Sequence, residues 1–236
     1  MVRPFLVFKE AGFNYPKNLA DLKGKPLVEA TLENLKGLKT LDAKFICMVK
    51  RAENRVFHTG AVITLAAPSA AIVEVSAETS GAACSALLAI QDIDNEAPLI
   101  LVNGDQLLSN VDLAEVILHF WERKLDGGII VFEDLHPRWS FVRCDSNDIV
   151  VEAAEKRPIS RLATAGFYYF ARGSDYVLGA TNMIKKDAHV NGSFYICPVY
   201  NELILLQKRI GIYKNHKNNY HTLSTPSDVE QYNRKN

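Results

Sequence analysis

Short apolar runs alternate with helix-like segments along the first half of this 236-residue chain, and that alternation limits its fold more than any other feature. Buried strands are predicted at five runs, residues 5–8, 45–49, 71–75, 99–103 and 128–133. Helices are predicted between them, at residues 27–38, 80–91 and 111–124. Because strands that alternate with helices form βαβ units, we predict an α/β protein with a mostly parallel central sheet and helices on both faces.

The second half of the chain predicts a small antiparallel addition to this sheet. Closely spaced strands are expected at residues 140–144, 149–154 and 165–170. A last helix at residues 199–208 and a strand at 210–213 come before a polar tail. The chain shows no internal repeat and no linker, so residues 1–236 are expected to form a single domain with a Rossmann-like fold.

Composition excludes two classes of partner. Basic and acidic residues both number 27, so the formal net charge is zero, whereas proteins that follow nucleic-acid phosphates are usually basic. No apolar run reaches the ~20 residues of a membrane helix. We therefore expect no nucleic-acid partner and no membrane partner. The oligomeric state stays open, with a homo-oligomer as one option.

The four cysteines, Cys47, Cys84, Cys144 and Cys197, are far apart in the sequence and form no CxxC pair. A metal site built on them is therefore not expected. Three of them lie among apolar or small residues, and Cys144 lies in a more polar stretch. Reduced thiols of this kind are typical of proteins in a reducing compartment, so we expect a cytoplasmic location.

Asp105 is the first candidate for chemistry, because it follows the strand predicted at residues 99–103. Ligands of open α/β sheets bind outside the carboxyl ends of the strands. A carboxylate at that place is a natural ligand for the Mg²⁺ of a nucleotide phosphate. Aspartate is equally common as a turn or helix cap, and the sequence around Asp105 leaves both interpretations open.

Three further segments carry candidate residues. Glu155-Lys156-Arg157-Pro158 ends a predicted strand, where a lysine can hold a phosphate and a glutamate can accept from hydroxyl groups. The same four residues are also typical of a solvated turn. Tyr15-Pro16-Lys17 is a turn by default. The small residues 79–83 allow close approach of a ligand, or simply tight packing of a helix on the sheet.

The order of these segments resembles that of the sugar-phosphate nucleotidyltransferases. YPKNLADLKGKPL at residues 15–27 is similar to the lysine-containing "PK…GKP" segment of that family. TSGAACSALLA at 79–89 resembles its base-contacting glycine segment, and PLILVNGDQ at 98–106 resembles its strand and metal-binding aspartate. VVEAAEKRPIS at 150–160 and ATAGFYYF at 163–170 resemble its "VEKP" sugar-phosphate segment and the strand that follows. The match is collinear from about residue 8 to the end of the chain.

This resemblance implies an activity and a set of roles. A phosphate oxygen of a sugar phosphate, or of another small phosphorylated acceptor, would attack the α-phosphorus of a nucleoside triphosphate, and pyrophosphate would leave. Catalytic roles are implied for Lys17, Asp105 and Lys156, with Asp105 as the ligand of Mg²⁺. Nucleotide contacts are implied for Gly12, Lys17, Gly81, Ala82, Asn103 and Gly104. Acceptor contacts are implied for Glu155, Lys156, Thr164 and Gly166.

Two segments depart from the family pattern. The family begins with a strand and a glycine-rich phosphate loop that ends in arginine, whereas only Gly12 is available in the corresponding stretch here. Arg3 and Lys9 are candidate substitutes for that loop because of their charge. Near the C-terminus, Thr222 stands where many relatives have a second metal-binding aspartate.

Three functions are therefore compared. The first is a nucleotidyltransferase that serves cell-surface or capsular polysaccharide biosynthesis. The second is a catalytically silent, nucleotidyltransferase-like module that binds an acceptor and regulates a partner. The third is a GT-A-type glycosyltransferase, which normally carries an Asp-x-Asp motif, of which Asn103-Gly104-Asp105 supplies only the last acid.

Overall fold

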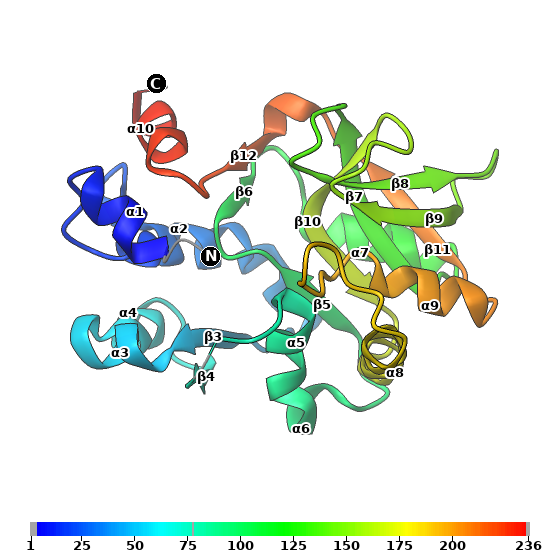
Figure 1. The fold of residues 1–236 in the computed structure, drawn as a ribbon, viewed down its shortest axis with the longest axis horizontal. Helices are drawn as coiled ribbons and strands as arrows, with labels where there is room; N and C mark the ends of the chain where they lie inside the picture. Colours follow the sequence, from blue (N-terminus) through cyan, green and yellow to red (C-terminus); the bar gives the residue numbers. More distant parts are fainter. Residues whose placement is uncertain (1–3, 77, 235–236) are drawn as a thin grey trace. The chain divides into compact units, whose positions relative to one another are not determined.

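The computed structural model describes residues 4–76 and 78–234, and the chain divides into two compact units, shown in Figure 1. Unit 1 comprises the described parts of Met1–Ala77, Asn103–Ala114 and Asn218–Asn236. Unit 2 comprises Glu78–Val102 and Glu115–Lys217. Both units are therefore assembled from segments that are distant in the sequence, and the expectation of a single domain stays a prediction.

Unit 2 is built on a six-stranded sheet. Its strands are β5 (Leu99–Val102), β7 (Gly127–Glu133), β8 (Ser140–Cys144), β9 (Val150–Glu155), β10 (Leu162–Phe170) and β11 (Ile210–Lys214). The strand β10 pairs antiparallel with β5, β7 and β8, while β11 pairs parallel with β7. It follows that β5, β7 and β11 run in one direction and β10 runs against them.

The hairpin of β8 and β9 is the predicted antiparallel addition. The two strands pair from Ser140 with Glu155 to Cys144 with Val150. The hairpin joins the sheet through β8, where Phe141 is opposite Ala163 of β10. The α/β fold class and this addition are both confirmed, but the sheet is mixed rather than mostly parallel, since β11 with β7 is the one parallel pair among its described strands.

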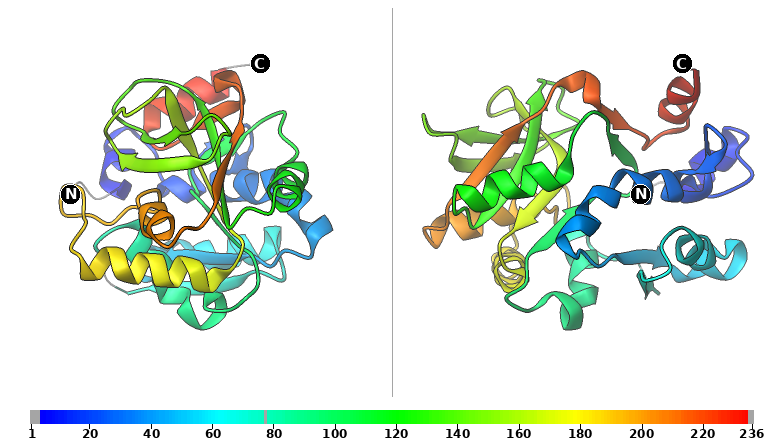
Figure 2. Two further views of the ribbon diagram at one scale, coloured as in Figure 1. Left: turned by 90° about the vertical axis from the view of Figure 1, so that its right-hand side faces the viewer. Right: turned by 180° about the vertical axis from the view of Figure 1, so that it is seen from behind.

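Helices cover both faces of the unit 2 sheet, as the two views of Figure 2 show. They are α5 (Ala82–Ala86), α6 (Ile90–Ile93), α7 (Leu113–Glu122), α8 (Gly173–Lys185) and α9 (Val199–Leu205). Phe120 of α7 stacks on Tyr169 at 5.5 Å between ring centroids, and Tyr200 of α9 stacks on Phe170 at 4.7 Å. Successive side chains of a strand point to opposite faces, so α7 and α9 lie on opposite sides of β10. Apolar burial on both faces makes this sheet the core of the unit.

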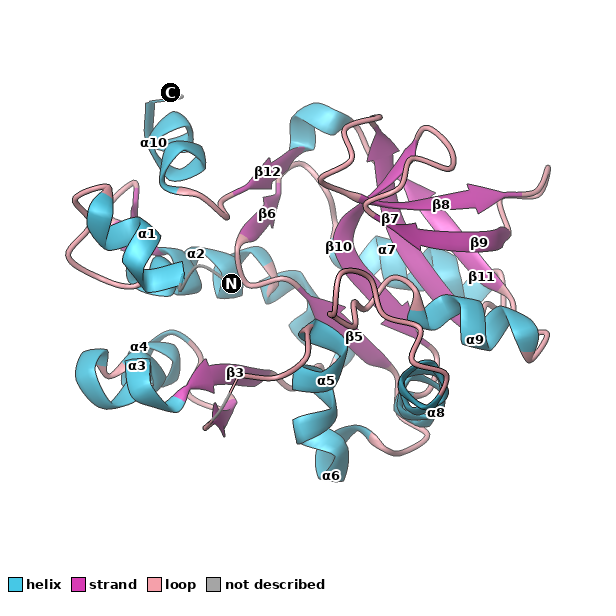
Figure 3. Cartoon of the chain, viewed as in Figure 1, coloured by secondary structure: helices cyan, strands magenta, loops and turns pink. Residues whose placement is uncertain are grey.

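Unit 1 is built from short helices and three two-stranded sheets, drawn by type in Figure 3. Its helices are α1 (Pro4–Glu10), α2 (Leu27–Asn34), α3 (Arg51–Phe57), α4 (Thr59–Ala66) and α10 (Pro226–Arg234). Its strands pair as β1 (Asp21–Leu22) with β2 (Lys25–Pro26), β3 (Ile46–Lys50) with β4 (Ala71–Val75), and β6 (Gln106–Leu108) with β12 (Tyr220–Thr222). Only the pair of β3 and β4 is parallel among these.

The core of unit 1 brings together residues from both ends of the chain. Phe8, Leu27, Leu107, Leu223 and Val229 are buried in one cluster. Because Leu107 and Leu223 come from the segments that carry β6 and β12, this cluster holds the loop before β6 against the N-terminal region. A smaller cluster joins α2, β3 and α4.

The predicted strand at residues 5–8 is wrong, because these residues lie in α1. A short apolar run fits a buried helix as well as a strand. Proline at the first helical position favours the helix, because its ring fixes φ and the missing N–H would have no partner there. Phe8 of this helix is buried in the core of unit 1, so its apolar side chain serves packing there.

Other predicted helices differ in extent. The segment 80–91 is broken into α5, the 3₁₀ turn η3 (Leu87–Ala89) and α6. The segment 27–38 leaves α-helical geometry after Asn34 and continues in the 3₁₀ helix η2 (Lys36–Leu41). The helix at 199–208 is present as α9 but is not the last one, because α10 follows it in the polar tail.

Candidate active site

Lys17 and Asp105 form an ion pair in unit 1. The Lys17 Nζ lies 2.6 Å from Asp105 Oδ2, although the two residues are 88 positions apart in the sequence. Both side chains keep about a quarter of their surface exposed, 24% and 27%. The pair is therefore partly shielded from water and still reachable by a ligand, which favours a charge interaction stronger than that of a fully exposed pair.

Backbone contacts hold each partner of this pair. Lys17 begins the 3₁₀ turn η1 (Lys17–Leu19), which follows the buried Pro16. The carbonyl oxygen of Asp105 accepts from the amide of Leu223 at 2.8 Å, just beyond β12. Asn103 and Gly104 are exposed in the turn that leads to Asp105. The turn predicted at the end of a strand thus presents a carboxylate to a lysine.

Gly12 ends helix α1. Its amide donates to the carbonyl of Lys9 at 3.0 Å, and the amide of Phe13 donates to that of Phe8 at 2.9 Å. Gly12 has φ of +88°, and the Phe8 and Phe13 rings meet edge to face at 5.1 Å. This pattern is a Schellman cap, in which a left-handed glycine satisfies the last helical carbonyls. The backbone donor that a phosphate loop would offer at Gly12 is therefore already engaged with the helix.

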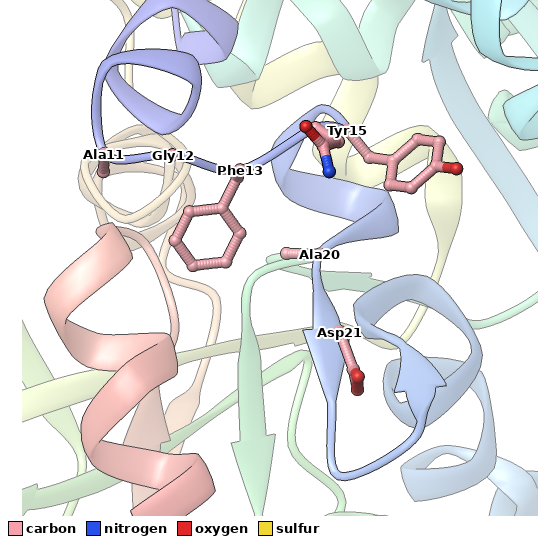
Figure 4. Close-up of a pocket in the computed structure, with 7 residues that line it drawn as sticks. Ala11, Gly12, Phe13, Tyr15, Ala20 and Asp21 are labelled. Carbon is pink, nitrogen blue, oxygen red and sulfur yellow. The ribbon is translucent and has the colours of Figure 1, made fainter.

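A shallow pocket of about 320 Å³ surrounds this cap, as Figure 4 shows. Its lining includes Gly12, Phe13, Tyr15, Ala20 and Asp21. Lys9 lines a neighbouring pocket of about 350 Å³ together with Gly12. Of the two candidate substitutes for the phosphate loop, Lys9 thus lies beside Gly12, whereas Arg3 lies outside the described residues.

Gly81 and Ala82 lie in unit 2 at the start of α5. Gly81 has φ of +122°, and a Cβ on it would lie 2.3 Å from the carbonyl oxygen of Phe194. The amide of Phe194 donates to the Ser80 carbonyl at 2.7 Å, and the amide of Ala83 donates to the Phe194 carbonyl at 3.1 Å. Because Gly81 has no side chain, the backbone of Phe194 can approach it closely. Ala82 is exposed beside it.

Glu155 ends β9 with its side chain largely buried, at 9% exposure. Its Oε2 accepts a short hydrogen bond from the hydroxyl of Ser140, the residue opposite it on β8. Burial raises the pKa of the Glu155 carboxyl, and the bond from Ser140 and the charge of Lys156 offset only part of this rise. The buried acid is thus oriented by a neighbour rather than left free.

Lys156 follows directly and is exposed. Its backbone is left-handed, with φ of +54°, a conformation that costs a non-glycine residue about 1–2 kcal/mol. The amide of Lys156 donates to the Trp139 carbonyl at 3.0 Å, and its Nζ donates to the Tyr195 hydroxyl at 2.8 Å. Unusual backbone geometry of this kind is concentrated at functional sites.

Thr164 and Gly166 lie on β10 at an irregularity of the sheet. The register between β10 and β7 shifts between Thr164 and Tyr168, and Gly166 has φ of +62°. The Thr164 and Tyr168 hydroxyls lie 2.9 Å apart across this irregularity. Burial raises the pKa of the Tyr168 phenol well above its usual range, and the hydrogen bond with Thr164 offsets part of this rise. Thr164 is thus held by Tyr168, as Glu155 is held by Ser140.

The predicted residues thus fall into two groups. Lys17, Asp105, Asn103, Gly104 and Gly12 belong to unit 1, and Gly81, Ala82, Glu155, Lys156, Thr164 and Gly166 belong to unit 2. The sequence analysis missed Ser140, Tyr168 and Tyr195, which hold members of the second group. Tyr168 lies within the recognised motif at 163–170, whereas the contact of Tyr195 with Lys156 spans 39 positions and leaves no local pattern.

The described residues contain neither a cluster of metal ligands nor a membrane-spanning helix. Within residues 4–76 and 78–234, no three His, Cys, Asp or Glu side chains are grouped so that they could hold a metal ion. In the same part of the chain, none of the helices has the length and apolar character needed to cross a membrane. The four cysteines are free thiols, and only Cys197 is fully buried.

Comparison with known proteins adds independent information. The family model described as "Nucleotidyl transferase" matches residues 13–193. The structure resembles a nucleoside-diphosphate-sugar pyrophosphorylase of Vibrio cholerae RC9, with a TM-score of 0.84 and 25% identity over 98% of this chain and 96% of that one. It also resembles an inositol-1-phosphate CTP transferase of T. maritima, with a TM-score of 0.72 and 15% identity over 99% and 94% of the two chains. A search of curated proteins found no match.

Proposed function

The chain belongs to the nucleotidyl transferase family, and we propose that it transfers a nucleoside monophosphate from a nucleoside triphosphate to a sugar phosphate or a similar small phosphorylated acceptor. The family predicted from the order of five motifs is confirmed, because the family model matches more than half of the chain. The protein is accordingly an enzyme of the nucleotidyltransferase class. Its acceptor, metal and biological role are the subject of the proposal.

The proposed reaction is a single displacement at phosphorus. A phosphate oxygen of the acceptor forms a bond to the α-phosphorus, and the bond from that phosphorus to the β-phosphate oxygen breaks. Pyrophosphate leaves with the electron pair of the broken bond. Such chemistry requires little covalent participation by the protein, so positioning and charge neutralisation carry most of the catalysis.

The pair of Lys17 and Asp105 supports the assignment of the triphosphate site to this part of unit 1. In the proposed reaction Lys17 moves its ammonium group from Asp105 to the phosphates, where it neutralises charge. The carboxylate of Asp105 is then released to bind a cation. The 2.6 Å contact between the two groups is the observation on which this assignment chiefly rests.

Asp105 is the residue proposed to hold Mg²⁺. Asp105 contributes one carboxylate, and the described residues contain no group of three or more His, Cys, Asp or Glu side chains that could hold a metal ion. Mg²⁺ commonly keeps several waters and binds through one or two carboxylates together with substrate phosphates. The donor set therefore fits an ion that is shared with the triphosphate. Bound Mg²⁺ supplies charge neutralisation on phosphate oxygens.

The acceptor is assigned to the second group of residues. Lys156 is proposed to contact the acceptor phosphate, because its ammonium is exposed and its backbone is held in an unusual conformation. Glu155 is proposed to accept from hydroxyl groups of the acceptor, and Thr164 and Gly166 to line the same site. Gly81 and Ala82 are proposed to contact the nucleotide base. Asn103, Gly104 and Gly12 stay proposed nucleotide contacts, Gly12 despite its role as a helix cap.

The family match favours this enzyme over a silent binding module and over a GT-A-type glycosyltransferase. Activated sugars made this way serve the assembly of cell-surface polysaccharides, and a capsular or similar pathway in the cytoplasm is the proposed setting. This part of the proposal rests on the sequence resemblance.

Pyrophosphate release tests the proposed function. The purified protein is incubated with Mg²⁺, each of the four nucleoside triphosphates and a panel of sugar phosphates and other phosphorylated acceptors. Release that depends on one acceptor and is lost in Asp105→Ala supports the proposal and identifies both substrates. Acceptor binding detected by calorimetry, without triphosphate binding and without pyrophosphate release, would favour the silent module instead.

A further inference from the structure

Lys156 owes its position to one aromatic residue. Its Nζ lies 2.8 Å from the Tyr195 hydroxyl and 4.9 Å from the centroid of the same ring. The side chain of lysine is flexible, and an exposed ammonium samples many rotamers unless something restrains it. Tyr195 restrains it twice, through a hydrogen bond to the charged group and through a cation–π contact.

Tyr195 is itself fixed by its neighbours. Phe194 is buried, and its backbone pairs with Ser80 and Ala83 on either side of Gly81. On the other side of Tyr195, Ile196 and Cys197 are also buried. The tyrosine therefore projects from a segment anchored on both sides, and the turn at Gly81 sets the place of that segment.

We propose that Tyr195 is a positioning residue for the acceptor phosphate: it holds the Lys156 ammonium ready, and the Gly81 turn holds Tyr195 in place through Phe194. This inference rests on the proposed function, since it assigns a partner to the lysine proposed to contact the acceptor. Preorganisation of this kind lowers the cost of ordering a flexible side chain when a ligand binds. Removal of the hydroxyl alone is expected to weaken acceptor binding while it leaves the displacement step largely intact.

Two readouts on one set of variants test the inference. Tyr195→Phe keeps the ring and removes the hydroxyl, and Tyr213→Phe on β11 is the matched control because its ring contacts His119, away from these residues. The first readout is the rate at which acetic anhydride acetylates Lys156, followed by mass spectrometry with Lys185 as an internal reference. The second is the split between KM for the acceptor and kcat. The first readout requires no ligand and no activity.

The expected result is a specific effect of Tyr195→Phe. Acetylation of Lys156 becomes about threefold faster while that of Lys185 is unchanged, because a hydrogen-bonded ammonium loses its partner. KM for the acceptor rises about fivefold with kcat within a factor of two, a modest change because the pair is exposed. Tyr213→Phe behaves as wild type. In a Lys156→Met background, Tyr195→Phe has no further effect on KM.

The outcomes separate this inference from the proposed function. If wild type releases no pyrophosphate with any acceptor, the proposed function fails, and the acetylation rates still decide whether Tyr195 holds Lys156. Equal acetylation of Lys156 in wild type and Tyr195→Phe overturns the inference. The inference is also overturned if Tyr195→Phe raises KM for the acceptor equally in wild type and in the Lys156→Met background. Tyr195 would then act by a route that does not involve Lys156.

The link through Gly81 has its own variant. Thr79→Ala loosens the Gly81 turn without adding atoms, because the Thr79 hydroxyl contacts the Gly81 carbonyl at 3.2 Å and the Ser85 hydroxyl at 2.6 Å. Faster acetylation of Lys156 is expected in this variant, and the increase disappears when Tyr195 is already phenylalanine. An undiminished increase in the double variant would show that the turn does not act through Tyr195.

Discussion

Lys17 and Asp105 neutralise each other in unit 1, at the proposed triphosphate site. Both side chains stay partly exposed, so the pair contributes little to stability. In the proposed reaction, a triphosphate replaces Asp105 as the partner of Lys17, and the accompanying cation replaces Lys17 as the partner of Asp105.

Removal of either charge should impair catalysis without unfolding the protein. In Asp105→Asn, kcat/KM is expected to fall at least about 100-fold, because charge stabilisation at a transferring phosphoryl group carries much of the catalysis. Lys17→Met should chiefly raise KM for the triphosphate. Stability should change by no more than about 1 kcal/mol, since a pair this exposed contributes little. Steady-state kinetics and urea denaturation measure both effects, and wild-type kcat/KM in Asp105→Asn would contradict the assignment.

Glu155 makes stability depend on pH. In the unfolded chain its carboxyl has an ordinary pKa of 4.5, and in the folded protein burial raises this pKa. Between the two values the folded state binds more protons, so the free energy of unfolding falls as pH rises through the folded pKa and stays lower above it. Glu155→Gln cannot ionise, so it should be more stable than wild type at neutral pH, with equal or lower stability in acid. Melting temperatures over a pH series measure this, and parallel profiles of the two proteins would count against it.

At the scale of elements, two glycines with positive φ differ in what surrounds them. A Cβ on Gly12 would meet no atom within 4 Å, whereas a Cβ on Gly81 would overlap the Phe194 backbone. Gly12→Ala should therefore cost only conformational strain, about 1–2 kcal/mol of unfolding free energy. Gly81→Ala should cost at least about 3 kcal/mol, because strain and overlap add. Chemical denaturation followed by circular dichroism ranks the two variants, and a larger loss in Gly12→Ala would contradict these environments.

Sequence patterns predicted elements where period, length and flanking residues agreed. The strands β4, β5, β7, β8 and β11 are present within a residue or so of their predicted bounds, because turn residues bound short runs that are rich in strand-forming residues such as Ile, Val and Phe. The run at residues 5–8 is ambiguous, since four apolar residues fit a helix equally well, and in the structure Phe8 of helix α1 packs on Phe13. The predicted helix at 80–91 begins only at Ala82, because backbone pairing of Ser80 and Ala83 with Phe194 fixes its start.

Residues at the start of helix α10 form a helix-start signal that is visible in the sequence but did not enter the prediction. The Thr225 amide donates to Asp228 Oδ2 at 2.9 Å, and the Asp228 amide donates to Thr225 Oγ1 at 3.2 Å. This is a capping box, followed by proline at the first helical position, and both features are visible in the sequence Thr225-Pro226-Ser227-Asp228. The tail is polar and α10 fully buries only Val229, so the sequence there lacks the apolar period that predicts a helix.

The residues of the candidate site, like the helices and strands, were predictable where they lie in a local sequence pattern. The motifs predicted Lys17, Asp105, Glu155 and Lys156 as site residues because each lies in a segment with a recognisable pattern, and their roles stay predictions. The ion pair of Lys17 with Asp105 and the contact of Lys156 with Tyr195 were not predictable, since they join residues 88 and 39 positions apart. Contacts of that range depend on the fold as a whole and leave no periodic trace in the sequence.

At the scale of the whole molecule, the chain passes between the two units four times, at residues 77–78, 102–103, 114–115 and 217–218. Neither unit is continuous in sequence, so each unit must close a loop formed by the other in order to bring its own segments together, at an entropic cost. We therefore expect one cooperative transition, with calorimetric and van't Hoff enthalpies equal, as for a single domain. Two separate transitions in scanning calorimetry would show that the units are independent domains.

The central claim is that the chain transfers a nucleotidyl group, and ³¹P NMR of the reaction mixture tests it most directly. With Mg²⁺, a nucleoside triphosphate and the accepted phosphate compound, the account predicts pyrophosphate together with two coupled diphosphate resonances of a new nucleotide product. These signals should be absent with Asp105→Ala. A nucleoside diphosphate without pyrophosphate would indicate γ-phosphoryl transfer, and an unchanged triphosphate spectrum with every acceptor would indicate no transfer; either result would contradict the account.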